Sequence, residues 1–131
     1  MNKSYLTENK INMKKILVVD DNTDILELIV MIFELEGFEV LGIKNGLEME
    51  SLVAAYQPDV ILLDVLLGNV DGRYLCHLVK SNSKTSHIPV IMISASHAAK
   101  SIQEEYCHPD DFVSKPFDID DLTMRVRKVL V

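Results

Sequence analysis

The runs Lys15-Ile-Leu-Val-Val-Asp20-Asp21 and Asp59-Val-Ile-Leu-Leu-Asp64 decide the fold of this sequence. Each holds four consecutive apolar residues, which is typical of a short strand buried on both faces of a sheet. Three carboxylates therefore stand where buried segments end. Burial and mutual repulsion both oppose ionisation of such groups, and a bound cation is the usual compensation. Because carboxylates offer only oxygen ligands, the pattern favours Mg²⁺ or a similar hard ion.

Strand and helix patterns alternate along the rest of the chain. Apolar, often β-branched runs predict buried strands at 15–20, 38–43, 59–64, 90–94 and 111–115. Helical spacing of apolar residues predicts helices at 24–36, 46–56, 72–80, 97–106 and 119–130. Five strand–helix repeats predict an α/β domain with a doubly wound parallel sheet. We expect this one domain to span residues 14–131, preceded by a polar, partly disordered extension at 1–13.

Composition excludes several classes of protein. The 131 residues are 48% hydrophobic, enough for a core, but no apolar run reaches the length of a membrane span. The polar start lacks the apolar centre of a signal peptide, so we expect a cytoplasmic protein without membrane association. The two cysteines, Cys76 and Cys107, fit a reducing compartment, and neither their number nor their spacing indicates a disulfide framework or a zinc site. A net charge of -7 argues against direct DNA binding.

Polar residues also follow the last two predicted strands. Ser94 ends the fourth strand and Lys115 ends the fifth, just as Asp20, Asp21 and Asp64 end the first and third. In a doubly wound sheet, ligands bind beyond the carboxyl ends of the strands. Three acids, a hydroxyl and an amine at that edge suit phosphoryl transfer, in which a carboxylate can be the nucleophile. Asp64 is the best nucleophile candidate, and the Asp20–Asp21 pair is the candidate metal-holding side.

These segments resemble the receiver domain of two-component response regulators. The resemblance rests on Asp20-Asp21, Pro58 to Asp64, Asp71-Gly72, Pro89 to Ala95 and Lys115-Pro116-Phe117, and it covers the chain from about residue 14. It implies a flavodoxin-like fold with strand order 2-1-3-4-5 and Asp64 as acceptor of a phosphoryl group from a histidine kinase or phosphotransfer protein. It also implies Mg²⁺ held by Asp21, Asp64 and the Leu66 backbone carbonyl, with Asp20 acting through water, and phosphoryl oxygens held by Ser94 and Lys115.

The resemblance further implies a switch. Phe112 lies at the aromatic switch position of the family, and the Lys115-Pro116 bond is often cis there. A new dianion on Asp64 would draw the Ser94 hydroxyl inward, and the Phe112 ring could turn into the vacated space. The changed surface would then act on a separate downstream target protein. We therefore expect a signalling protein rather than an enzyme.

Two alternatives stay open. One is a pseudo-receiver, which binds partners without being phosphorylated; such proteins usually lack one of the acids or the lysine, and none is missing here. The other is an aspartyl-nucleophile phosphatase of the haloacid-dehalogenase type, which has a second aspartate two residues after the nucleophile. That position is Leu66. An apolar side chain beside the acceptor predicts slow attack by water, and hence a long-lived phosphorylated form.

Overall fold

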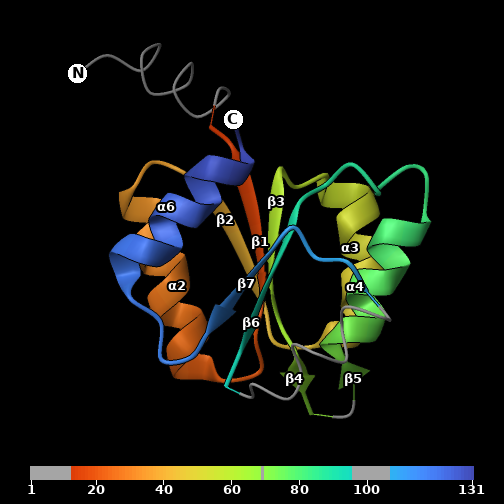
Figure 1. Cartoon of the computed structure of the whole chain (residues 1–131), viewed down its shortest axis with the longest axis horizontal. Helices are drawn as coiled ribbons and strands as arrows, with labels where there is room; N and C mark the ends of the chain where they lie inside the picture. Colours follow the sequence, from red (N-terminus) through yellow and green to blue (C-terminus); the bar gives the residue numbers. More distant parts are fainter. Residues whose placement is uncertain (1–12, 69, 96–106) are drawn as a thin grey trace.

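A computed structural model describes residues 13–68, 70–95 and 107–131 (Figure 1). Its main sheet has five parallel strands: β1 (Lys15–Val19), β2 (Glu39–Ile43), β3 (Val60–Asp64), β6 (Val90–Ser94) and β7 (Asp111–Ser114). Their order across the sheet is β2-β1-β3-β6-β7. Once the two-residue strands β4 and β5 are set aside, this is the predicted 2-1-3-4-5 order of a flavodoxin-like fold, so the predicted fold is confirmed.

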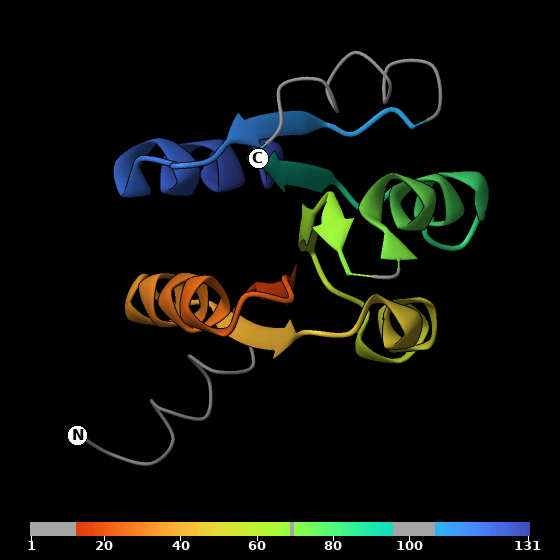
Figure 2. The same cartoon turned by 90° about the horizontal axis from the view of Figure 1, so that it is seen from below.

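Helices cover both faces of the sheet. On one face lie α2 (Thr23–Leu35) and α6 (Ile119–Val129), and on the other lie α3 (Met49–Tyr56) and α4 (Gly72–Ser81), as Figures 1 and 2 show. Alternate residues of β1 point to opposite faces, which divides the core in two. Ile16 packs in the cluster under α2 and α6, whereas Leu17 packs in the cluster under α3 and α4. Because all five strands are parallel, their carboxyl ends lie at one edge of the sheet.

Strand burial differs from the prediction at the edges of the sheet. The central strands β1, β3 and β6 are almost wholly buried, as expected from their continuous apolar sequences. The outer strands β2 and β7 are mostly half-buried. Within the described part of the chain, β2 and β7 each pair with one strand only. Solvent therefore reaches their residues, although their apolar runs predict buried strands. Strand order, which the prediction of burial did not use, accounts for the difference.

The bounds of α2, α4 and α6 agree with the predicted helices to within one residue, and each of these helices begins with a side-chain cap. Asn22 accepts a hydrogen bond from the Ile25 amide at the start of α2, and Asp118 caps α6 in the same way. The predicted helix 46–56 begins with a 3₁₀ turn, Gly46–Glu48, before α3. The predicted helix at 97–106 and nearly all of the predicted extension at 1–13 lie outside the described residues.

One feature of the core was not predicted from the sequence. The structure joins Cys76, on α4, to Cys107, before β7, in a disulfide with Cα atoms 6.1 Å apart. The number and spacing of the two cysteines did not indicate this disulfide, because 31 residues separate them in sequence and only the fold brings them together. Cys76 is fully buried. None of the described helices is long and apolar enough to cross a lipid bilayer.

Candidate functional site

The predicted site residues gather at the carboxyl edge of the sheet. Asp20 and Asp21 follow β1, Asp64 is the last residue of β3, and Ser94 is the last residue of β6. Lys115 follows β7, and its amide donates to the Ser94 carbonyl at 2.8 Å, which continues the pairing of the last two strands. Parallel register places these ends side by side, since Val19 is opposite Leu63 and Asp64 is opposite Ile93. The strand-end prediction therefore placed the side chains at one edge correctly.

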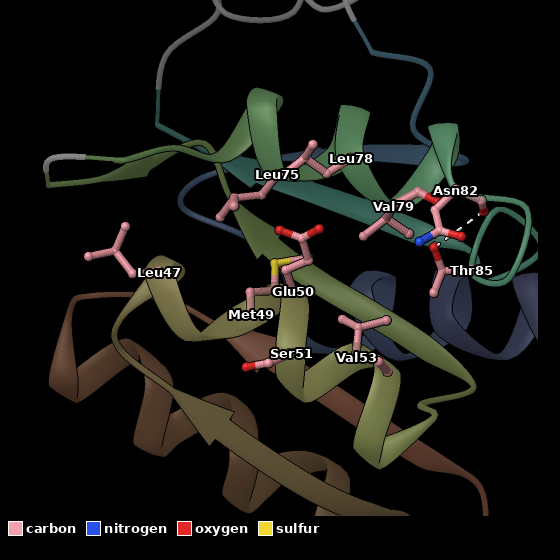
Figure 3. A pocket seen from close by; sticks show the side chains of 11 residues that line it. Leu47, Met49, Glu50, Ser51, Val53, Leu75, Leu78, Val79, Asn82 and Thr85 are labelled. Carbon is pink, nitrogen blue, oxygen red and sulfur yellow. Dashed lines mark hydrogen bonds between the residues drawn. The ribbon is translucent and has the colours of Figure 1, made fainter.

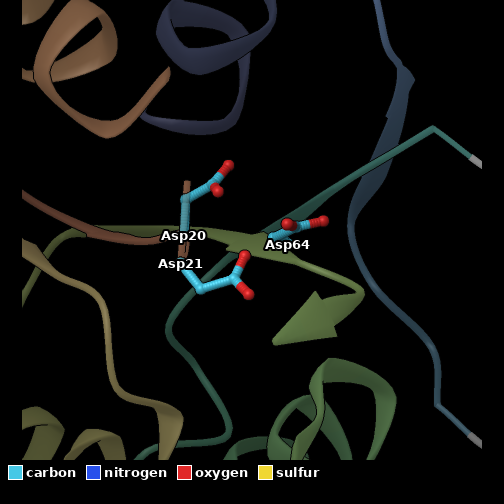
Figure 4. Close-up of side chains that lie close together, drawn as sticks. All are labelled: Asp20, Asp21 and Asp64. Carbon is cyan, nitrogen blue, oxygen red and sulfur yellow. The ribbon is translucent and has the colours of Figure 1, made fainter. Parts of the chain in front are cut away.

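Three carboxylates form the centre of the site (Figure 4). One carboxylate oxygen from each of Asp20, Asp21 and Asp64 lies within 4.8 Å of the others. Asp20 and Asp64 are buried, with exposed fractions of 2% and 6%, while Asp21 is exposed. Oxygen atoms at this separation, on hard anionic donors, suit a divalent cation such as Mg²⁺. The residues therefore fit the predicted ion.

Asp20 is engaged by protein donors on both of its oxygens. The Asn22 amide donates to Oδ1 at 2.9 Å, and the Lys115 ammonium lies 3.0 Å from Oδ2. Asp21, by contrast, presents its carboxylate to solvent beside Asp64. Asp21 is thus the more accessible of the two carboxylates, and the roles of Asp20 and Asp21 toward Mg²⁺ stay predictions. The orienting role of the Asn22 amide had no signal in the sequence beyond its place in the turn after β1.

Lys115 links the two buried acids. Its Nζ atom lies 3.0 Å from Asp20 Oδ2 and 3.3 Å from Asp64 Oδ2, and its side chain is largely buried. Lys115 is 51 residues from Asp64 and 95 residues from Asp20 in sequence, so only the sheet brings them together. An ammonium group in this position reduces the repulsion between the acids and can bind an oxyanion placed over Asp64.

The pKa of Asp64 is raised above the ordinary value for an aspartate. Burial of the carboxyl is the largest cause, and the nearby charge of Asp20 adds to it. The Lys115 ammonium and a hydrogen bond from the Leu66 amide act in the opposite direction. Lys115 therefore compensates the buried charge only in part. The site as it stands favours the arrival of a further cation.

Ser94 and Phe112 lie on neighbouring strands at the same edge. Ser94 is almost fully buried, with 1% exposed, and stands opposite Ser114 in the register. Phe112, opposite Met92, is half-buried and packs against the core cluster under α3 and α4. The predicted switch pair thus occupies adjacent strands, with Phe112 two residues before the strand end. Their roles stay predictions.

A small hairpin that the sequence did not predict follows Asp64. Its strands are β4 (Leu66–Leu67) and β5 (Val70–Asp71), and Leu66 is opposite Asp71. The Gly72 amide donates to the Val65 carbonyl at 2.8 Å, and Asp71 caps α4 by accepting from the Arg73 amide. Gly72 also packs so tightly on the Asp64 carbonyl that a side chain there would overlap it. The Asp71-Gly72 pair was the only sequence signal for this close packing.

A separate hollow of about 420 Å³ lies between α3 and α4 (Figure 3). Apolar side chains line much of it, among them Leu47, Met49, Val53 and Leu78. It contains none of the strand-end residues, so it is not part of the carboxylate site.

The comparison with known families decides the class of this chain. Residues 16–127 match the sequence profile of the response regulator receiver domain. The chain belongs to this family. Among solved structures, the receiver domain is similar to a putative response regulator from Chloroflexus aurantiacus J-10-fl, with a TM-score of 0.85 and 29% identity, covering 91% of this chain and 98% of that one. The predicted family is therefore confirmed.

Curated relatives of this receiver domain are regulatory proteins. It is 34% identical over 119 residues to the DNA-binding dual master transcriptional regulator RpaA of Synechocystis, covering 90% of this chain and 49% of that protein. It is 35% identical over 118 residues to the phosphate regulon transcriptional regulatory protein PhoB of Pseudomonas aeruginosa, covering 89% of this chain and 52% of that protein. The receiver domain thus spans about half the length of these relatives. Since one of them is a DNA-binding protein by name, the predicted absence of DNA binding has no support from them.

Proposed function

We propose that this receiver domain is a phosphoacceptor switch in a two-component pathway and that Asp64 is the group phosphorylated. The observation that carries the proposal is the position of the Asp64 carboxylate. It is buried at a strand end, 3.3 Å from the Lys115 ammonium and within 4.8 Å of carboxylate oxygens of Asp20 and Asp21. A carboxylate held in this way can attack phosphorus, while the lysine binds an oxygen of the incoming group.

The donor would be a phosphohistidine on a histidine kinase or a phosphotransfer protein. An oxygen of Asp64 forms the bond to phosphorus, the phosphorus–nitrogen bond breaks, and the imidazole leaves with the bonding electrons and takes up a proton. Mg²⁺ held by Asp21, Asp64 and the Leu66 carbonyl, with Asp20 acting through water, would supply positive charge for the phosphoryl oxygens. Lys115 and the Ser94 hydroxyl bind the remaining oxygens. Transfer then depends mainly on positioning and charge stabilisation, with little covalent work by other side chains.

The pairing of β6 with β7 also accounts for how phosphorylation of Asp64 could change the surface of the domain. Ser94 ends β6 and Phe112 lies on the adjacent β7, so movement of the Ser94 hydroxyl toward a phosphoryl group alters the space beside the Phe112 ring. The surface around β7 and α6 then changes and acts on a separate target protein. We place this action in the cytoplasm. The chain acts as a signalling protein and not as an enzyme with turnover.

Incubation with acetyl phosphate and Mg²⁺ tests the proposal, with intact-mass spectrometry as the measurement. We expect the protein to gain one phosphoryl group, and Asp64→Asn to gain none. Asp120→Asn, an exposed change of equal charge on α6, is the matched control and should be modified like the parent.

The alternatives give different results in the same experiment. A pseudo-receiver would stay unmodified, and a signal that survived Asp64→Asn would place the acceptor elsewhere. An aspartyl phosphatase would turn over a phosphate ester steadily. The exposed, apolar Leu66 two residues after Asp64 offers no carboxylate for that reaction.

A further inference from the structure

The two cysteines of this chain are buried, paired and outside the carboxylate site. Cys76 is completely buried on α4, and Cys107 is 2% exposed. They are the only cysteines in the sequence, and the structure joins them across a separation of 31 residues. Nothing in the acceptor chemistry uses them. A disulfide between distant elements restricts how those elements move relative to each other, so its position decides what it can control.

One end of the disulfide is attached to the acceptor side of the domain. Cys76 lies in α4, one turn after Gly72, whose amide donates to the Val65 carbonyl and which packs on the Asp64 carbonyl. Hence α4 is fixed to the backbone that carries the acceptor.

The other end is attached to the entrance of β7. Cys107 lies four residues before Asp111, where β7 begins, and five before Phe112. Cys107, Cys76 and Met92 belong to one core cluster, and Phe112 packs against it. The disulfide therefore ties the strand that carries Phe112 to the helix beside the acceptor. If β7 moves relative to α4 on phosphorylation, the disulfide limits how far it can move.

We propose that Cys76 and Cys107 form a reversible redox site that restrains the response of β7 to phosphorylation. The inference rests on the proposed function, since it concerns the conformational change that follows phosphorylation of Asp64. Disulfides in reducing compartments are usually transient and redox-sensing, which suits a pair that forms no part of a larger disulfide framework. The oxidised protein is the restrained state, and the reduced protein is the responsive one.

The chemistry needs a two-electron oxidant, for which we take hydrogen peroxide. One cysteine thiolate attacks a peroxide oxygen, becomes a sulfenic acid and releases the other oxygen as water after protonation. The second thiol attacks the sulfenic sulfur, the sulfur–sulfur bond forms, and a second water leaves. A dithiol reverses the change by two thiol–disulfide exchanges and becomes a cyclic disulfide itself. Because both cysteines are buried, oxidation requires local opening and is slow.

Linkage gives the restraint a measurable consequence at the acceptor. If the disulfide disfavours the phosphorylated arrangement of β7, it lowers by the same factor the affinity for a phosphoryl mimic at Asp64. We expect beryllofluoride, in the presence of Mg²⁺, to bind the oxidised protein about fivefold or more weakly than the reduced protein. The oxidised and reduced proteins have the same residues at the acceptor site and differ only in the disulfide. A difference in their affinity for beryllofluoride would therefore come from the disulfide.

The first measurement follows the thiols. After treatment of the folded protein with hydrogen peroxide, we expect the mass to fall by two hydrogen atoms and both cysteines to resist alkylation after unfolding. Dithiothreitol should restore two alkylatable thiols. Two thiols that stayed fully alkylatable after oxidation would overturn the proposal.

The second measurement is calorimetric titration of beryllofluoride into the oxidised and reduced protein with Mg²⁺. Cys76→Ala/Cys107→Ala is the control, with Cys76→Ser/Cys107→Ser as a second pair in case the alanines leave a damaging cavity. Both pairs should bind like the reduced parent and ignore the oxidant. Equal affinity of the two parent forms would overturn the inference alone. Absence of binding in both forms, together with no phosphoryl gain from acetyl phosphate, would instead overturn the phosphoacceptor function on which it rests.

Discussion

The Nζ atom of Lys115 lies 3.3 Å from Oδ2 of Asp64, so the acceptor carboxylate is already paired with a cation. The same nitrogen lies 3.0 Å from Asp20 Oδ2. Lys115 therefore has two roles that oppose each other. It stabilises the buried acids before any ligand arrives, and it competes by charge with a divalent cation that would bind to those acids.

Replacement of Lys115 by alanine should therefore tighten the binding of Mg²⁺ alone. Removing a positive charge a few ångströms from the carboxylates makes the site more negative, and we expect the dissociation constant for Mg²⁺ to fall by about tenfold at low salt. Titration calorimetry measures this directly. Lys128→Ala, an exposed change of equal charge on α6, should leave the constant nearly unaltered. Weaker Mg²⁺ binding by Lys115→Ala would contradict the competition between the two cations.

Asp64→Asn should stabilise the protein in the absence of metal. Since burial and Asp20 raise the pKa of Asp64, the folded state holds the proton to a higher pH than the unfolded state does. The free energy of unfolding therefore falls as pH rises from about 4 through the folded-state pKa, and that cost persists at neutral pH. The asparagine variant avoids this cost and should therefore be more stable than the parent at pH 7.

The difference between Asp64→Asn and the parent should shrink as pH falls through the folded-state pKa and should vanish below about pH 3, where the parent carboxyl is protonated in both states. Urea unfolding at several pH values, without Mg²⁺, measures this trend. Asp120→Asn supplies the baseline for loss of one surface charge. A variant less stable than the parent at pH 7 would mean that Lys115 outweighs burial at this carboxylate.

The central strands are predictable from the sequence for a physical reason. Central strands such as β1 and β3 are buried on both faces, so their sequences are continuously apolar and their ends are sharp. Polar residues at such ends must meet at one edge of a parallel sheet, which is why the sequence alone groups Ser94 and Lys115 with the acids.

What the sequence could not predict depends on contacts between distant residues or on very short elements. The Cys76–Cys107 pair leaves no local pattern, because the two residues become neighbours only when α4 and the entrance of β7 pack together. The strands β4 and β5 have two residues each, too few to show a period.

The exposed side chain of Leu66 should lengthen the life of the phosphorylated protein. Leu66 is 60% exposed two residues after Asp64, and its amide donates to Asp64 Oδ1. An apolar side chain there cannot orient a water molecule for attack on the aspartyl phosphate. We expect Leu66→Asn to shorten the half-life roughly threefold to tenfold by positioning water.

The decay is measured by intact mass after removal of acetyl phosphate. Leu35→Asn provides the matched control, because Leu35 is 82% exposed at the opposite end of the fold, where α2 ends. Its half-life should equal that of the parent. An unchanged half-life in Leu66→Asn would remove the role assigned to this side chain.

Gly72→Ala should damage both the fold and the site, because the residue packs directly on the acceptor backbone. An added Cβ would overlap the Asp64 carbonyl oxygen, and neither Asp64 nor α4 can move without disturbing β3 or the hairpin. We expect a loss of about 2–4 kcal/mol in the free energy of unfolding, as for other overpacked cores. Phosphorylation by acetyl phosphate should fall as well, since relief of the overlap displaces the nucleophile.

Gly37→Ala separates this steric effect from simple loss of glycine flexibility. Gly37 follows α2 with a φ of +97°, a conformation that costs an alanine about 1–2 kcal/mol, but a Cβ there has no atom within 4 Å. The Gly37 variant should therefore lose less stability in urea unfolding and keep the parent's rate of phosphorylation. If Gly72→Ala were no more harmful than Gly37→Ala in both measurements, the close packing of α4 on the Asp64 backbone would not be what positions the acceptor.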